Sequence, residues 1–104
     1  MRVQITIGDE TLTYAQASKD WINKSFAHAK QEGYVPCVRV QILEPGIAMG
    51  LITPNCASVG GGGGTLSAAQ KEIHEAWIRH HLSSTHYTGG NLIAFLNELE
   101  RLVS

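Results

Sequence analysis

A chain of 104 residues is long enough for one domain and too short for several. Hydrophobic residues make up 43% of it and charged residues 16%, which excludes a disordered chain and fits a globular protein outside the membrane. Eight Lys and Arg residues nearly balance nine Asp and Glu residues, and the basic residues are scattered along the chain. Duplex nucleic acid is therefore not expected as the main partner, because neutralising its phosphates requires a basic patch.

The first predicted elements are a strand and a helix. Apolar and polar residues alternate over residues 3–7, which is the period of a strand with one face in water. A turn at residues 8–10 ends this strand. Thr13 and Gln16 then have the spacing of a capping box, so a helix is expected to begin at Thr13 and to end near residue 32, where Gly33 provides the C-terminal cap.

The middle of the chain predicts a β-hairpin. Residues 38–42 alternate between apolar and polar, as the first strand does. Pro45 and Gly46 favour a turn, because proline presets one backbone angle and glycine accepts a positive φ. Residues 47–53 form the second strand of the hairpin, which Pro54 ends.

Two more helices are expected in the second half. Ser67 and Gln70 have the spacing of a capping box, and apolar residues recur at helical spacing as far as about Leu82. After a polar loop, Asn91 is the expected cap of a last helix with a continuous apolar stripe.

Together these elements predict one α+β domain spanning residues 1–104, in the order β-α-β-β-α-α. Strands with one apolar face need a cover, and amphipathic helices need an apolar surface to cover, so we expect a three-stranded sheet with three helices packed on one face. The first helix would connect its flanking strands by a right-handed crossover if those strands are parallel. The residues expected on the solvent face are Arg2, Gln4, Thr6, Arg39 and Gln41.

Five consecutive glycines interrupt the chain between the hairpin and the second helix, within a glycine-rich loop predicted at residues 57–65. A glycine-rich loop before a helix N-terminus is the layout of an anion site. The loop lacks the lysine that a P-loop places directly after its glycines, and so many glycines are poorly preorganised. We therefore favour a flexible tether, with a phosphate cradle and a loop that orders on a partner as alternatives. The residues of the phosphate alternative are Gly60, Gly61, Gly62, Gly63, Gly64, Thr65 and Ser67.

The sequence favours a cytoplasmic protein. Residues 1–10 lack the continuous apolar segment of a signal peptide, and no apolar run approaches the length that spans a bilayer. Cys37 and Cys56 are then expected to be reduced thiols rather than a disulfide, and Cys37, among apolar residues, is expected to behave as a small core residue.

Neither a metal site nor a cofactor is expected. Four of the five histidines lie between His74 and His86, but His74 and His81 are about 10 Å apart along a helix and cannot share one ion. A site made from the cysteines and His86 would need the fold to bring them together. The favoured interpretation is that His80 is partly buried on its helix and that His74 and His81 lie at the surface.

Catalysis has weak support. Cys56, Ser58 and Gly60 resemble a nucleophile elbow whose first glycine is replaced, but no base or oxyanion donor can be named beside them. A thiol nucleophile at Cys56 is the other enzymatic interpretation.

The leading hypothesis is therefore a protein–protein interaction or adaptor module without catalytic activity, which binds another protein through the solvent face of the sheet or a sheet edge. Self-association of the chain is included in this hypothesis. The predicted contact residues are Arg2, Gln4, Arg39 and Gln41, with Tyr87 in a second loop patch. The alternatives are a small-ligand or phosphate-binding protein that uses Gly60–Gly64 with the following helix N-terminus, and an enzyme that uses Cys56 or Ser58.

Overall fold

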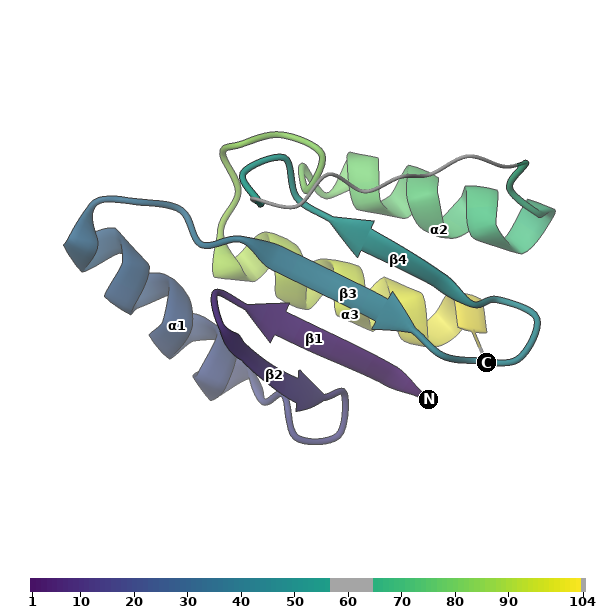
Figure 1. Ribbon diagram of the computed structural model, residues 1–104, viewed down its shortest axis with the longest axis horizontal. Helices are drawn as coiled ribbons and strands as arrows, with labels where there is room; N and C mark the ends of the chain where they lie inside the picture. The colour runs from purple at the N-terminus through teal and green to yellow at the C-terminus, as the bar shows by residue number, and fades with distance from the viewer. Residues whose placement is uncertain (57–64, 104) are drawn as a thin grey trace.

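The computed structural model describes residues 1–56 and 65–103 and confirms an α+β protein. Figure 1 shows a twisted sheet with helices behind it. The elements in chain order are β1 (Val3–Ile7), β2 (Glu10–Thr13), α1 (Lys19–Glu32), β3 (Val38–Ile42), β4 (Met49–Ile52), α2 (Ala68–Arg79) and α3 (Gly89–Val103).

The sheet has four strands in the order β2-β1-β3-β4, and all of its pairs are antiparallel. The prediction of three strands was therefore wrong by one, because residues 10–13 were interpreted as the end of a turn and the start of the first helix. Gly8 and Asp9 form a two-residue hairpin loop between Ile7 and Glu10, and Gly8 takes the positive φ of 68° at the first loop position. The predicted turn is present, and the chain returns from it as a strand.

Helix α1 begins five residues later than the capping-box spacing suggested. Its N-cap is Ser18, whose Oγ accepts a hydrogen bond from the backbone N–H of Trp21 at 3.0 Å. Thr13 and Gln16 do contact each other, with the backbone N–H of Thr13 donating to Gln16 Oε1 at 3.2 Å, but they do so in the turn that follows β2. The contact between Thr13 and Gln16 therefore lies at the end of strand β2 and does not start a helix.

The other two helix starts also depend on side-chain caps. The predicted capping box of Ser67 and Gln70 is present at the start of α2. At the start of α3 the cap is Thr88 instead of Asn91: Thr88 Oγ1 accepts from the Asn91 backbone N–H, and Asn91 Oδ1 accepts from the Thr88 backbone N–H at 2.8 Å. Asn91 is thus the third residue of the helix and completes a capping box.

The connection through α1 differs from the expected crossover. Strands β1 and β3 are antiparallel neighbours. Because β2 is also antiparallel to β1, strands β2 and β3 run in the same direction, and α1 connects them across β1. Helix α1 packs mainly against α3, which in turn packs against α2.

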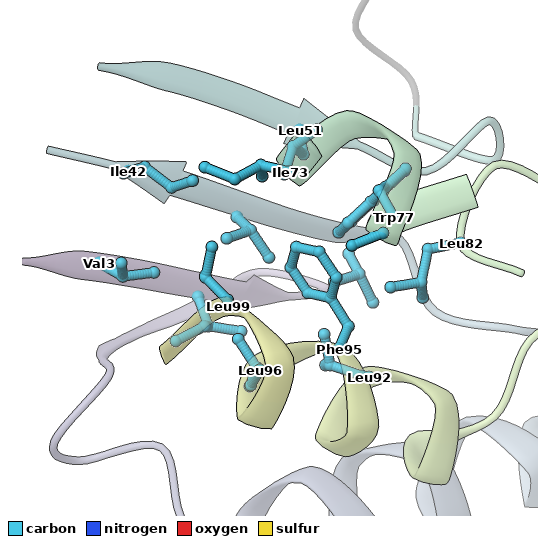
Figure 2. Packing of buried hydrophobic residues seen from close by; sticks show 14 of the residues in the cluster. Val3, Ile42, Leu51, Ile73, Trp77, Leu82, Leu92, Phe95, Leu96 and Leu99 are labelled. Atoms are coloured by element: carbon cyan, nitrogen blue, oxygen red, sulfur yellow. The ribbon is translucent and has the colours of Figure 1, made fainter. Parts of the chain in front are cut away.

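The core lies between the sheet and the helices (Figure 2). Strand residues that face the helices are buried, and the residues that alternate with them are polar and mostly exposed. Helix α3 contributes a stripe of large side chains, and Phe95 meets Trp77 of α2 edge to face with ring centroids 5.1 Å apart. The fully buried residues with the largest side chains are Ile5, Ile22, Ile42, Ile73, Leu82, Leu92, Phe95 and Leu99.

Candidate functional site

One face of the sheet carries no described helix, and Figure 1 looks onto this face, with the sheet in front of α3. The strand register places two rows of side chains across it. Thr11, Thr6, Arg39 and Ile52 form one row, and Thr13, Gln4, Gln41 and Gly50 form the other. We call these eight residues the uncovered face.

The uncovered face is polar, and its one charged residue is basic. Gln4, Arg39 and Gln41 are exposed. The hydroxyls of Thr6 and Thr11 lie 2.8 Å apart and bond across the β1–β2 pair. Arg39 lies between Thr6 and Ile52 in its row. A face with one basic residue and several hydroxyl and amide groups complements an acidic, polar surface.

Arg2 lies at the border of the uncovered face, directly before β1. Its backbone N–H donates to Glu44 Oε1 at 2.6 Å, and its backbone carbonyl accepts from the N–H of Leu43 at 2.8 Å. The structure therefore brings Arg2, Gln4, Arg39 and Gln41, all predicted as contact residues, to the same side of the sheet.

Both edges of the sheet are partly occupied within the described residues. At the β2 edge, Thr13 donates its N–H to Gln16 Oε1, and its carbonyl oxygen accepts from the N–H groups of Gln16 and Ala17. At the β4 edge, the carbonyl oxygen of Ala48 accepts from Gln70 Nε2 at 3.1 Å. Strand addition needs a run of backbone groups without partners, so these contacts favour the face over the edges as a binding surface.

Cys37 and Cys56 form a disulfide bond, which corrects the prediction of two reduced thiols. Cys37 directly precedes β3 and Cys56 follows β4, so the hairpin brings their Cα atoms to 4.8 Å. Both residues are half-buried. A thiol nucleophile at Cys56 is not present in this form of the chain, because its sulfur is bonded to Cys37.

Tyr87, which the sequence placed in an exposed loop patch, is 5% exposed and packs in the core cluster. Its hydroxyl bonds to the carbonyl oxygen of Pro36 and lies 2.8 Å from Thr53 Oγ1 and 2.7 Å from Asn55 Oδ1. Burial raises the pKa of Tyr87 above its ordinary value, so the phenol stays protonated and able to donate. We therefore exclude Tyr87 from the contact surface and assign it a structural role.

The polar atoms around Tyr87 join the same strand ends as the disulfide. Thr53 Oγ1 accepts from the backbone N–H of Val38 at 3.0 Å, and Asn55 Nδ2 donates to the carbonyl oxygen of Val35 at 2.6 Å. Thr53 is fully buried, and each of its polar contacts lies within this cluster. Thr53, Asn55 and Tyr87, with the disulfide, form what we call the disulfide corner.

The five glycines of the predicted phosphate loop, Gly60–Gly64, lie outside the described residues, as does Ser58. Thr65 is exposed. Ser67 is engaged within its own helix: its Oγ accepts from the Gln70 N–H at 3.2 Å, and its N–H donates to Gln70 Oε1 at 2.9 Å. Ser67 therefore caps α2, and the phosphate alternative stays a prediction.

The histidine-rich segment holds one polar cluster. His80 Nε2 lies 2.8 Å from Glu98 Oε1, and Arg79 bonds to the other carboxylate oxygen of Glu98. These bonds join the end of α2 to α3. The hydrogen bond from His80 and the charges of Arg79, His80 and Arg101 lower the pKa of Glu98, against the opposing effect of desolvation. His80 is half-buried, whereas His74 and His81 are exposed, as the sequence predicted.

Within residues 1–56 and 65–103, no group of three or more His, Cys, Asp or Glu side chains is placed to hold a metal ion. No helix in the same part of the chain is both long enough and apolar enough to pass through a bilayer. No protein family, curated protein or solved structure matches the sequence or fold of this chain.

Proposed function

We propose that this protein is an interaction module without catalytic activity, which binds an acidic, polar surface of another protein through the uncovered face of its sheet. The observation that carries the proposal is the position of Arg39 in the middle of that face, between Thr6 and Ile52, with exposed glutamines in the next row. Arginine among neutral hydrogen-bonding groups is a frequent centre of protein interfaces.

The location of the protein is part of the same proposal. Disulfides persist in oxidising compartments and are rare in reducing ones. The bond between Cys37 and Cys56 therefore argues against the cytoplasmic location that the sequence favoured, and we infer that the partner is met where this disulfide stays oxidised.

The experiment places a photo-crosslinking amino acid at Gln4, on the uncovered face, in cells that express the chain. We expect one stoichiometric adduct with another protein. In binding assays with that partner, Arg39→Glu should weaken affinity at least about fivefold, because a central interface arginine contributes more than about 1 kcal/mol. Lys71→Glu, an equal charge change at an exposed position of α2, should leave the affinity unchanged.

Three outcomes would count against the proposal: no adduct from Gln4, an adduct formed equally well by the Arg39→Glu chain, or equal weakening by Arg39→Glu and Lys71→Glu. An adduct between two copies of the chain would identify self-association as the function of the face. Thermal unfolding of both variants checks that the fold is retained.

A further inference from the structure

A groove with a volume of about 550 Å³ lies between the end of α1, the segment that leads into β3 and the turn before α3. This volume falls within the range of roughly 300–1,000 Å³ that is usual for small-molecule sites. The side chains that line the groove are mainly aromatic or aliphatic, which is also usual for such sites. They include Phe26, Ala27, Tyr34, Val35, Pro36 and Tyr87.

The way α1 ends creates the groove. Gly33 takes a positive φ of 85°, its N–H donates to the carbonyl oxygen of Lys30 at 3.1 Å, and the N–H of Tyr34 donates to the carbonyl oxygen of Ala29 at 3.0 Å. These two bonds are the Schellman motif, which satisfies the last carbonyls of a helix while the chain turns away from its axis. The turn leaves Tyr34 at the border of the groove with 54% of its surface exposed.

The opposite wall is fixed by the disulfide corner. Tyr87 packs edge to face on Phe26, with ring centroids 6.0 Å apart, and its hydroxyl donates a hydrogen bond to the carbonyl oxygen of Pro36. Asn55 Nδ2 donates a hydrogen bond to the carbonyl oxygen of Val35. Walls that are already fixed need little ordering when a ligand enters, so less of the interaction energy is lost on binding.

The groove contains one charged group among its described lining residues. This group is Lys30, in the last turn of α1. Lys30 forms no salt bridge with any residue in the described part of the chain, and no acidic residue is found among the lining residues there. Glu32 is two positions further along the helix and does not face Lys30 across a turn. An apolar groove with a single cation complements a ligand that has one apolar ring and one negative charge.

We propose that this groove binds a small aromatic monocarboxylate, with the ring against Phe26, Tyr34 and Pro36 and the carboxylate at the ammonium group of Lys30. The site is separate from the uncovered face and does not depend on the protein interaction proposed for that face.

The test uses the oxidised chain of residues 1–104 and two probes of the same shape, 3-phenylpropionate and its neutral amide. Titration is followed by the backbone amide signals in two-dimensional NMR spectra. We expect saturable shifts centred on Phe26, Tyr34 and Thr88. The carboxylate should bind about two- to fivefold more tightly than the amide, which is the usual effect of one exposed ion pair.

Two substitutions distinguish the contribution of the Lys30 charge to binding from that of the apolar groove, and a third is a control. Lys30→Met should weaken the carboxylate about two- to fivefold, to the affinity of the amide, and should leave the amide unchanged. Lys71→Met, which removes an exposed lysine from α2, is the matched control and should change neither affinity. Ala27→Trp, at an exposed position of α1 that lines the groove, should fill it and abolish saturable binding of both probes.

The proposal is overturned if neither probe causes saturable shifts below about 10 mM, a concentration that corresponds to negligible affinity for a site of this size. It is also overturned if the shifts centre on residues outside the groove, or if Lys30→Met weakens the acid and the amide equally. Retained binding in a folded Ala27→Trp chain would exclude the groove as well. If that chain fails to fold, the comparison of the two probes on Lys30→Met and Lys71→Met still decides the outcome.

Discussion

The hydroxyl of Tyr87 donates a hydrogen bond to the carbonyl oxygen of Pro36, 51 residues earlier in the chain. The bond joins the turn before α3 to the segment that leads into β3, and so connects the two halves of the fold at the disulfide corner. Thr53 and Asn55, which follow β4, contact the same hydroxyl. One buried phenol thus connects three segments of the chain.

Tyr87→Phe should lower the free energy of unfolding by about 1–3 kcal/mol, because it removes the hydrogen bond to the carbonyl oxygen of the buried Pro36 while the ring still fills its place. Chemical unfolding in urea measures this change. Tyr34→Phe is the matched control, since Tyr34 is 54% exposed and should give a change below about 0.5 kcal/mol. Equal effects of the two substitutions would show that the hydroxyl of Tyr87 contributes nothing specific.

Loss of the disulfide should destabilise the chain without unfolding it. The bond closes a loop between residues 19 positions apart, for which the loss of chain entropy predicts a stabilisation of about 3 kcal/mol. The chain should remain folded, because Thr53, Asn55 and Tyr87 hold the same strand ends by hydrogen bonds.

The measurement compares the oxidised chain with the double variant Cys37→Ala, Cys56→Ala by urea unfolding and by amide exchange at Val38. A double variant that is unfolded in the absence of urea would contradict the second half of this prediction. An unchanged midpoint of unfolding would contradict the first half.

Stability should fall in acid partly because of Glu98. The hydrogen bond from His80, with the nearby charges of Arg79, His80 and Arg101, lowers the pKa of the Glu98 carboxyl in the folded chain. A carboxyl whose folded pKa is lowered contributes stability that is present above its unfolded pKa and is lost as the pH falls through its folded pKa. For a glutamate this loss falls between about pH 5 and pH 2.

Glu98→Gln should therefore lower the free energy of unfolding at pH 7 and have a progressively smaller effect as the pH falls and the Glu98 carboxyl becomes protonated in the folded chain. Urea unfolding at a series of pH values checks this. Glu72→Gln, at an exposed position of α2, is the control and should have the same small effect on stability throughout the pH series. If the free energy of unfolding of the Glu98→Gln chain changed with pH in parallel with that of the parent chain, the role of this carboxyl would be contradicted.

The strands and helices that the sequence predicted well are those with a clear apolar period. Strands β1 and β3 alternate without interruption and are fully buried on one side. Strand β2 was missed because only Leu12 of its four residues is even half-buried. Thr13 and Gln16 also have the spacing of a helix start, and that spacing alone does not distinguish a capping box from a turn after a strand.

The disulfide corner could not be predicted from local pattern. Cys37 and Cys56 come together because β3 and β4 pair, whereas the sequence analysis assumed a reducing compartment, in which disulfides are rare. Tyr87 lies in a polar segment that is typical of an exposed loop, and its burial depends on contacts with residues far away in the chain. The groove could not be predicted from the sequence for the same reason, since its walls come from three separate segments.

Two neighbouring glycines at the start of α3 should respond differently to alanine. Gly89 is buried, and a Cβ atom there would lie 3.2 Å from Asn23 Oδ1, 3.4 Å from Phe26 and 3.5 Å from Ile22. Gly89→Ala should therefore require the Asn23 side chain to shift by a few tenths of an ångström, which offsets part of the gain in helix propensity, so it should stabilise the chain less than Gly90→Ala does. At Gly90 a Cβ atom would meet only Thr88 Oγ1, at 3.6 Å, so Gly90→Ala should be neutral or stabilise the helix by up to about 1 kcal/mol. Urea unfolding of both variants measures the difference. If Gly89→Ala proved as stable as Gly90→Ala, the close packing of α1 on the first turn of α3 would be wrong, and with it the geometry of the groove that Phe26 and Gly89 both line.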